Sequence, residues 1–244
     1  MKKFFFLMIF LFCLTRLESE VLADSFMSGI LRFTGITATP KQLKGVDEYN
    51  MKAGGDLWEV KLSPKKILSR ITTDGGYRTP LFLPGDKGIL ALKGNNVVRI
   101  SIADGTTETL YAIRDVEKLV GFDKNDQDKV LVLIENEDSN PSLGLLSIKS
   151  GEMTSMTYDG KSKEHRSIIN HIKGWERNYN NIAVYPKTET KPGMAGSIEW
   201  TDVYMKQGDK EPINLSRCNG INCGQPSLSH DGNRVVFVKA TGLQ

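Results

Sequence analysis

Short apolar runs, separated by turn residues, recur along most of the chain. They are Leu57–Leu62, Gly88–Leu92, Val97–Ile102, Lys129–Ile134, Leu143–Ile148, Ile182–Tyr185, Asp202–Met205 and Arg234–Val238. Each run is rich in Val, Ile, Leu or aromatic residues and is bounded by Gly, Asn, Asp or Pro, as closely spaced strands are. Helical periodicity is scarce, and only Arg114–Val120 predicts a helix, a short one. The pattern predicts an all-β fold of the sandwich, barrel or propeller kind.

The residues between the runs predict tight turns. Gly85–Gly88, Asp123–Asp126 and Asp231–Asn233 each lie just before an apolar run. Asp, Asn and Gly tolerate the positive φ that hairpin turns require. Ala103–Gly105 and Lys149–Gly151 follow apolar runs, and we expect them to form outer hairpins.

Two distant parts of this pattern repeat each other. A shift of 146 residues carries Asp56-Leu57-Trp58 onto Asp202-Val203-Tyr204 and Pro80 onto Pro226. Two weaker copies lie between them, which gives about 49 residues per unit, near the length of a propeller blade. The four units cover residues 56–94, 96–136, 143–187 and 197–240.

The last unit has an order of residues that is found in a known family. It contains Asp202-Val203-Tyr204, then Leu215-Ser216, then Pro226–Gly232 directly before an apolar strand. This order resembles the TolB-like, WD-type β-propeller repeat D-I-Y, L-T and P-x-W-S-P-D-G, with Leu228 in place of Trp and His230 in place of Pro. The resemblance implies an all-β propeller of four-stranded blades, of which four are visible in the sequence.

The length of the chain does not decide whether the propeller ring closes. Six blades of propeller length would need about 270 residues, and the chain without its leader has about 220. Either the ring has few blades, or residues 24–55 complete it, or the chain is part of a longer protein.

The N-terminus predicts export. Met1-Lys2-Lys3 is followed by the apolar run Phe4–Leu14, which has the n-region and h-region of a secretory signal peptide and is too short for a membrane span. We expect cleavage after Ala23, so that residues 1–23 are the signal peptide and residues 24–244 the propeller domain. The alternative is a lipid anchor at Cys13, which the preceding Phe12 disfavours. The predicted location is periplasmic or secreted.

Charge and hydropathy narrow the range of partners. The formal net charge of the whole chain is +3, a near-balance that gives no basic field for nucleic acid and no polybasic patch for anionic lipid. No later segment has the apolar length of a membrane span.

Cys218 and Cys223 remain after signal cleavage, in the sequence Cys-Asn-Gly-Ile-Asn-Cys. An even number of cysteines in an exported chain favours a disulfide, and the Asn-Gly between them favours a turn that brings the sulfurs together. Free thiols and a metal site are the alternatives, but a metal would need further ligands close by.

No catalytic or metal-binding motif is recognisable, and no cofactor is expected. Gly193–Ser197 is a Gly-rich hairpin tip rather than a nucleophile elbow. His165 and His171 lack the spacing of a helical metal pair, and Asp123–Asp128 lacks the Gly and Glu of a calcium loop.

Trp175, Arg177 and Tyr179 are the predicted binding residues. They lie together in a loop segment, and this combination of residue types is common at protein interfaces.

Three functions are compatible with these features. The first is an exported, non-enzymatic propeller that binds or scaffolds another envelope protein or peptide, as the resemblance implies. The second is the N-terminal propeller of a secreted prolyl oligopeptidase-like peptidase, whose hydrolase domain would follow. The third is a small lyase or hydrolase with its acid and base in the channel of the propeller.

Overall fold

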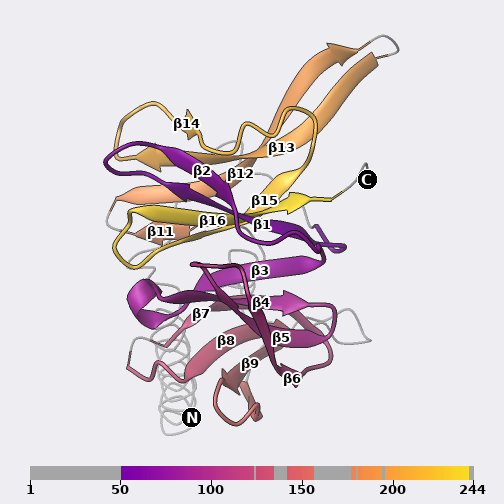
Figure 1. The fold of residues 1–244 in the computed structure, drawn as a ribbon, viewed down its shortest axis with the longest axis vertical. Coiled ribbons are helices and arrows are strands. Elements are labelled where there is room, and N and C mark those ends of the chain that lie inside the picture. The colour runs from indigo at the N-terminus through magenta and orange to yellow at the C-terminus, as the bar shows by residue number, and fades with distance from the viewer. Residues whose placement is uncertain are drawn as a thin grey trace, which may run out of the picture.

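The computed structural model describes residues 51–123, 125–134, 142–156, 177–179, 181–193 and 196–241. The predicted signal peptide, Trp175, His165 and His171 lie outside these residues. The described chain is all-β, with antiparallel strands and a single turn of 3₁₀ helix, η1 (Pro84–Asp86) (Figure 1). No helix in this part of the chain is long and apolar enough to cross a membrane.

Three groups of four strands follow one another along the chain. The first is β3 (Tyr77–Phe82), β4 (Gly88–Lys93), β5 (Asn96–Ser101) and β6 (Thr107–Ala112). The second is β7 (Val116–Phe122), β8 (Lys129–Ile134), β9 (Ser142–Ser147) and β10 (Met153–Met156). The third is β11 (Arg177–Tyr179), β12 (Ile182–Gly193), β13 (Gly196–Gln207) and β14 (Ile213–Asn214). Within each group every strand pairs antiparallel with the next.

The remaining strands, from opposite ends of the described chain, form a composite group. They are β1 (Gly55–Lys61), β2 (Ile67–Arg70), β15 (Cys223–Leu228) and β16 (Arg234–Ala240), paired in the order β15-β16-β1-β2. β1 and β16 pair over their whole length, from Gly55↔Ala240 to Lys61↔Arg234. One further pair, Gly55↔Tyr77, joins this group to β3–β6 in a single eight-stranded sheet.

The four groups are stacked face to face (Figure 1). Apolar side chains lie between them. Leu57, Val236 and Val238 of the composite group pack against Tyr77, Ile89 and Ile100 of β3–β5. Leu81, Leu90 and Val97 of the β3–β6 group pack against Leu119, Val130 and Val132 of the β7–β10 group. Val60, Val235 and Phe237 of the composite group pack against Val184, Val203 and Leu215 on its other face. Burial of apolar area between neighbouring sheets therefore provides the cohesion of the fold.

The 146-residue shift found in the sequence is also present in the structure. It carries the bounds of β3 onto those of β15, and Thr79 onto Gln225. Both residues are buried, both have positive φ (51° and 52°), and each lies within a β-bulge between its own strand and the next. The Gln225 side chain accepts a hydrogen bond from the Thr79 N–H at 2.8 Å, so the two bulges contact each other. Positive φ is costly for threonine and for glutamine, and this contact helps to hold both in place.

The units expected from the sequence are out of phase with the observed groups. Each unit contains the third and fourth strands of one group and the first and second strands of the next. Unit boundaries therefore fall between the second and third strands of each group. This offset places strands from the first and last units together in the composite group.

The expected short helix at Arg114–Val120 is wrong, because this segment belongs to β7. Val116, Leu119 and Val120 are buried, and their spacing mimics a helical period. Register shifts between Val116 and Lys118 and between Leu119 and Gly121 break the alternation of the strand. A bulged strand therefore gives the same apolar spacing as one turn of helix.

The close approach of β1 and β16 leads to a test. A Cβ added at Gly55 would lie 2.0 Å from the Lys239 carbonyl oxygen, so Gly55→Ala must push the two strands apart. We expect it to lower the free energy of unfolding by about 2–4 kcal/mol, measured by urea denaturation.

Gly144→Ala in β9 is the matched control. The added Cβ would meet the side-chain ends of Ile134 and Met153 at 3.0 Å and 3.2 Å, which can move aside. We expect a loss below about 1 kcal/mol. Equal losses for the two variants would contradict the tight pairing of β1 with β16.

Candidate functional site

β12 and β13 are the longest strands, and they form a two-stranded ribbon that projects from the stacked sheets (Figure 1). The ribbon pairs from Ile182↔Gln207 to Gly193↔Gly196. β11 pairs only with Ile182–Val184, and β14 pairs only with Tyr204 and Met205. Among the described residues, no further strand therefore flanks the outer part of the ribbon. Two-stranded ribbons are marginally stable in water, so this one needs internal contacts or a partner.

The two edges of the ribbon differ in their hydrogen-bonding groups. Val203 donates its N–H to Ser216 Oγ and accepts from the Leu215 N–H, so its backbone groups point away from β12. Antiparallel alternation gives Ser197 and Glu199 the same outward direction on the β13 edge. The residues opposite Val203 and Ser197 are Pro186 and Pro192, which face outward on the β12 edge. Because proline has no N–H, the β12 edge lacks two donors that the β13 edge keeps.

One face of the ribbon carries cross-strand aromatic contacts. The Tyr204 hydroxyl donates to Glu189 Oε1, the Lys187 ammonium lies 4.8 Å from the centre of the Tyr204 ring, and Tyr185 stacks on Tyr204 at 6.3 Å. Burial, together with the neighbouring Glu189 carboxylate, raises the pKa of Tyr204 to about 12, so the phenol stays a donor at neutral pH. These contacts hold the base of the ribbon, whereas Ile198 near the tip is 52% exposed.

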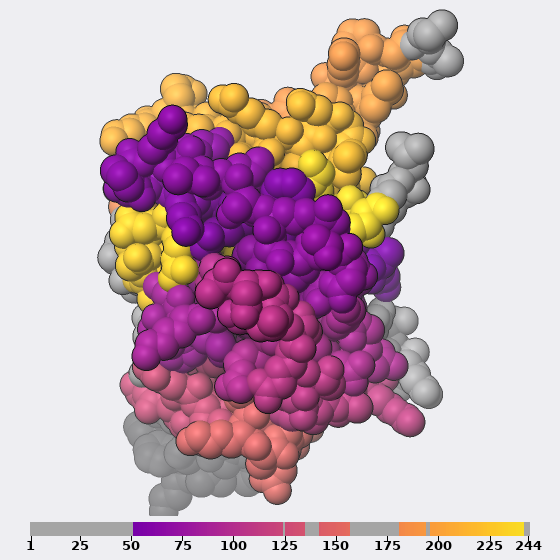
Figure 2. Space-filling model, in the orientation of Figure 1, coloured from indigo at the N-terminus to yellow at the C-terminus, as the bar shows by residue number. Residues whose placement is uncertain are grey.

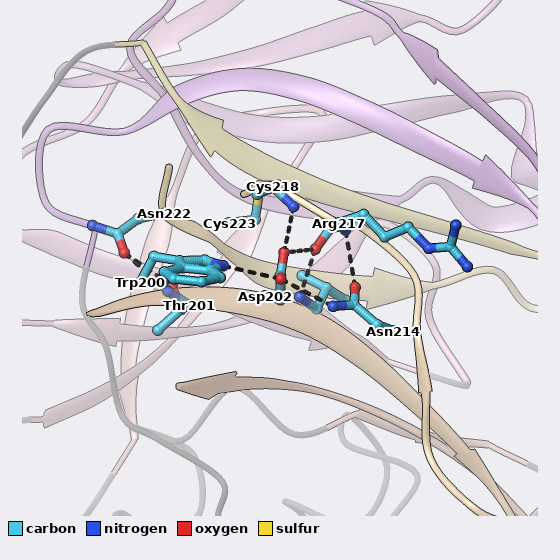
Figure 3. Close-up of a disulfide and its surroundings, with 10 residues drawn as sticks. Trp200, Thr201, Asp202, Asn214, Arg217, Cys218, Asn222 and Cys223 are labelled. Carbon is cyan, nitrogen blue, oxygen red and sulfur yellow. Dashed lines mark hydrogen bonds between the residues drawn. A yellow bond between two sulfur atoms is a disulfide. The ribbon is translucent and has the colours of Figure 1, made fainter. Parts of the chain in front are cut away.

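A buried carboxylate anchors the ribbon to the loop after β14 (Figure 3). Asp202 is 2% exposed and accepts hydrogen bonds from Ser216 Oγ (2.6 Å), the Cys218 N–H (2.6 Å), Asn214 Nδ2 (2.9 Å) and Trp200 Nε1 (3.1 Å). Burial alone would raise the pKa of Asp202, but these donors outweigh it and lower the pKa below its usual value. The ionised form of Asp202 therefore fixes the loop against β13.

Cys218, in the segment after β14, and Cys223, the first residue of β15, lie at disulfide distance (Figure 3). Both are buried in the apolar cluster that contains Val184 and Phe237. Asn222, between them, accepts a hydrogen bond from the Thr201 N–H at 3.0 Å. The segment thus rests on the same strand that Asp202 anchors.

The binding residues expected from the sequence are not tested by the structure. Trp175 lies outside the described residues, and only the backbone of Arg177 and Tyr179 is described, in β11. Sequence reasoning missed the ribbon because it ended one strand at Tyr185 and began the next at Asp202. The signal that could have extended them is the alternation of Thr and charged residues between Pro186 and Pro192.

A second group of titratable side chains joins two turns at one end of the sheets. Asp86, in the β3–β4 turn, accepts hydrogen bonds from the His230 N–H and lies 3.0 Å from His230 Nδ1. Arg234 donates to the Asp86 carbonyl and lies 3.5 Å from the buried Glu59 carboxylate. These contacts pair the turn of one group with the turn of the next. In the described part of the chain, no cluster of three His, Cys, Asp or Glu could hold a metal ion.

No protein-family model matches the chain, and no curated protein matches it. Among solved structures, the chain is similar to "putative TolB from Agrobacterium tumefaciens" (13% identity, TM-score 0.35, covering 73% of this chain and 59% of that one). It is also similar to TolB from Acinetobacter baumannii (12% identity, TM-score 0.36, 82% and 50%) and to AtxE2 isopeptidase (10% identity, TM-score 0.27, 80% and 44%). The chain thus spans between two fifths and three fifths of the length of these proteins.

Removal of the Asp202 carboxylate should release the loop. We expect Asp202→Ala to lower the free energy of unfolding by about 2–4 kcal/mol at neutral pH, because it leaves several buried donors without an acceptor. The pKa of Asp202 is lower in the folded chain than in the unfolded chain. Its carboxylate therefore adds stability above about pH 4 that is lost as the pH falls through the folded-state pKa. Urea denaturation at neutral and acidic pH would measure both effects.

Asp209→Asn, at an exposed carboxylate in the turn before β14, is the control and should leave stability unchanged. A wild-type loss of stability on acidification that persists undiminished in Asp202→Asn would contradict the role of this carboxylate.

The cysteine pair can be tested by alkylation of the purified protein. We expect iodoacetamide to label neither Cys218 nor Cys223 in denaturant unless a reductant is added, as read by intact mass. Reduction should lower the free energy of unfolding by about 2 kcal/mol, the entropic value for so short a loop. Labelling of both residues without reductant would exclude the bond.

Proposed function

We propose that the chain is an exported, non-enzymatic β-propeller that binds another protein or peptide of the cell envelope through the β13 edge of its ribbon. The observation that carries this proposal is the difference between the two ribbon edges. Prolines block strand pairing along the β12 edge, while the β13 edge keeps outward N–H groups at Ser197 and Glu199.

Four features support the propeller part of the proposal. The groups are four-stranded, they pack face to face, and one of them is built from the two ends of the described chain. In addition, hydrogen bonds connect the first strands of successive groups. The Gln225 side chain of β15 accepts from the Thr79 N–H of β3, and Thr79 Oγ1 accepts from the Leu119 N–H of β7 at 3.4 Å. Such contacts between innermost strands are what an arrangement of blades around one axis requires.

The chemistry of an open strand edge favours a peptide partner. Outward N–H and C=O groups that recur every second residue match the backbone of an extended segment, which can add as a further strand. Exposed edges of this kind also risk aggregation, and proteins commonly block them with proline or charge. The chain blocks one edge with two prolines and leaves the other with Glu199, which favours use of the β13 edge in binding.

The test compares two proline variants at one rung of the ribbon. Glu199 and Thr190 lie directly opposite each other and face outward on opposite edges. Glu199→Pro removes a donor from the β13 edge, and Thr190→Pro removes its counterpart from the β12 edge. Neither change removes a bond between β12 and β13, since both residues point away from the ladder.

Binding would be read by a photo-crosslinking amino acid in place of Ile198, in the cells that produce the protein. We expect one adduct of defined mass, lost in Glu199→Pro and kept in Thr190→Pro. Thermal denaturation would verify that both variants fold. If Glu199→Pro does not fold, Ser197→Pro would replace it. An adduct that survives equally in both folded variants would exclude binding at the β13 edge.

A further inference from the structure

A second surface, independent of the ribbon edge, lies where the outermost strands of two neighbouring groups meet. β2 is the last strand of the composite group, and β14 is the last strand of its neighbour. The Lys66 ammonium in the turn before β2 donates to the Asn214 carbonyl of β14 at 2.8 Å, so the two strands adjoin. Figure 2 shows both segments at the surface, at the upper left of the molecule.

Large apolar side chains are exposed on both sides of this contact. Ile67 and Leu68 on β2 are 52% and 42% exposed, and Ile213 on β14 is 51% exposed. The 146-residue shift relates Ile67 to Ile213, so the same exposed position occurs on two neighbouring groups. We call these three residues, with the cations beside them, the outer seam.

Cations surround the apolar side chains of the outer seam. Lys61 lies opposite Ile67 in the β1–β2 ladder, Lys65 and Lys66 precede β2, and Arg217 follows β14. All four are exposed. Burial and then the positive charge of Arg217 lower the pKa of Lys66, so these cations lie near one another.

The carboxylates nearest the outer seam balance part of its charge. Glu59 lies 4.0 Å from the Lys61 ammonium and 3.5 Å from Arg234, and the negative charge of Asp202 acts on Lys66. Both carboxylates are only 2% exposed, so the charges at the surface of the seam are those of the four exposed cations. The turn before β14 carries Asp209, Lys210 and Glu211, which together add one negative charge. The fold thus brings more positive than negative charge to the outer seam, although the net charge of the whole chain is nearly balanced.

We propose that the outer seam docks the protein on the surface of an anionic lipid bilayer. The seam lies at the last strands of two neighbouring groups, where Ile67 shares one face of its strand with Lys61 and Leu68 points to the other face. Lysine and arginine would contact the headgroups, and the isoleucine and leucine side chains would enter the boundary of the acyl chains.

Vesicle flotation tests the proposal with the protein purified from the exported fraction of its cells. We expect it to float with phosphatidylcholine vesicles that contain phosphatidylglycerol, to bind pure phosphatidylcholine much more weakly, and to detach as salt is raised. Lys65→Gln with Arg217→Gln, which keeps the Lys66 hydrogen bond, should lower the partition coefficient about 25-fold, at about fivefold per cation. Ile67→Asn should lower it further.

Three controls separate this surface from the rest of the molecule. Lys149→Gln with Lys191→Gln removes the same charge elsewhere, and Met153→Asn changes an exposed residue on β10, another outermost strand. Both should leave flotation unchanged. Glu199→Pro should also leave it unchanged, so that failure of the ribbon proposal and failure of this one are distinguishable.

Equal flotation with both kinds of vesicle, or flotation that the Lys65 and Arg217 changes do not affect, would overturn the proposal. An absence of vesicle binding would overturn it too. In that case, a photo-crosslinker at Leu68 that gives a defined protein adduct in cells would assign the outer seam to an acidic protein segment instead.

Discussion

The pairing of β1 with β16 holds together a fold whose parts are otherwise local. Three of the four groups are made of strands that follow one another along the chain, so the strand pairing within each of them is local. The composite group needs both ends of the described chain, and its two faces contribute to two of the three apolar clusters between groups. Loss of this pairing would expose both clusters, which is why close packing at Gly55 matters beyond one contact.

Buried polar side chains add order to this apolar packing. Thr79 and Gln225 hold equivalent positive-φ bulges, and their hydrogen bond requires one sheet to face the next in a single register. The 146-residue shift also relates Asp56 to Asp202. Each carboxylate is buried on its own strand, and each accepts hydrogen bonds from the end of the next strand or from the segment that follows it. Apolar burial alone tolerates sliding of one sheet on another, whereas paired polar groups do not. The repeat therefore conserves the contacts that fix register, although few residues are identical.

Much of the strand pattern could be predicted from the sequence, because short alternating runs bounded by Asp, Asn and Gly have few other structures. The runs that contain Leu90, Val132 and Val236 became β4, β8 and β16, and their turns lie where the sequence placed them. The Arg114–Val120 segment could not be predicted correctly, since bulges disturb strand alternation in a way that only the partner strand reveals. The candidate sites were harder still. Lys66 and Arg217 are far apart in sequence, and only the packing of β2 beside β14 brings their charges together.

The composite group also has a consequence for how the chain is made. Synthesis proceeds from the N-terminus, so β1 emerges long before its partner β16. During that interval the apolar side chains of β1, Leu57 among them, have no sheet to pair with. Contacts between such distant residues form late and slowly, because a long loop must close before they stabilise the chain. The strands of the intervening groups are made in order, but the composite group stays incomplete until β15 and β16 arrive. Among the described strands, the pairing that joins the two ends is therefore the last that a growing chain can form.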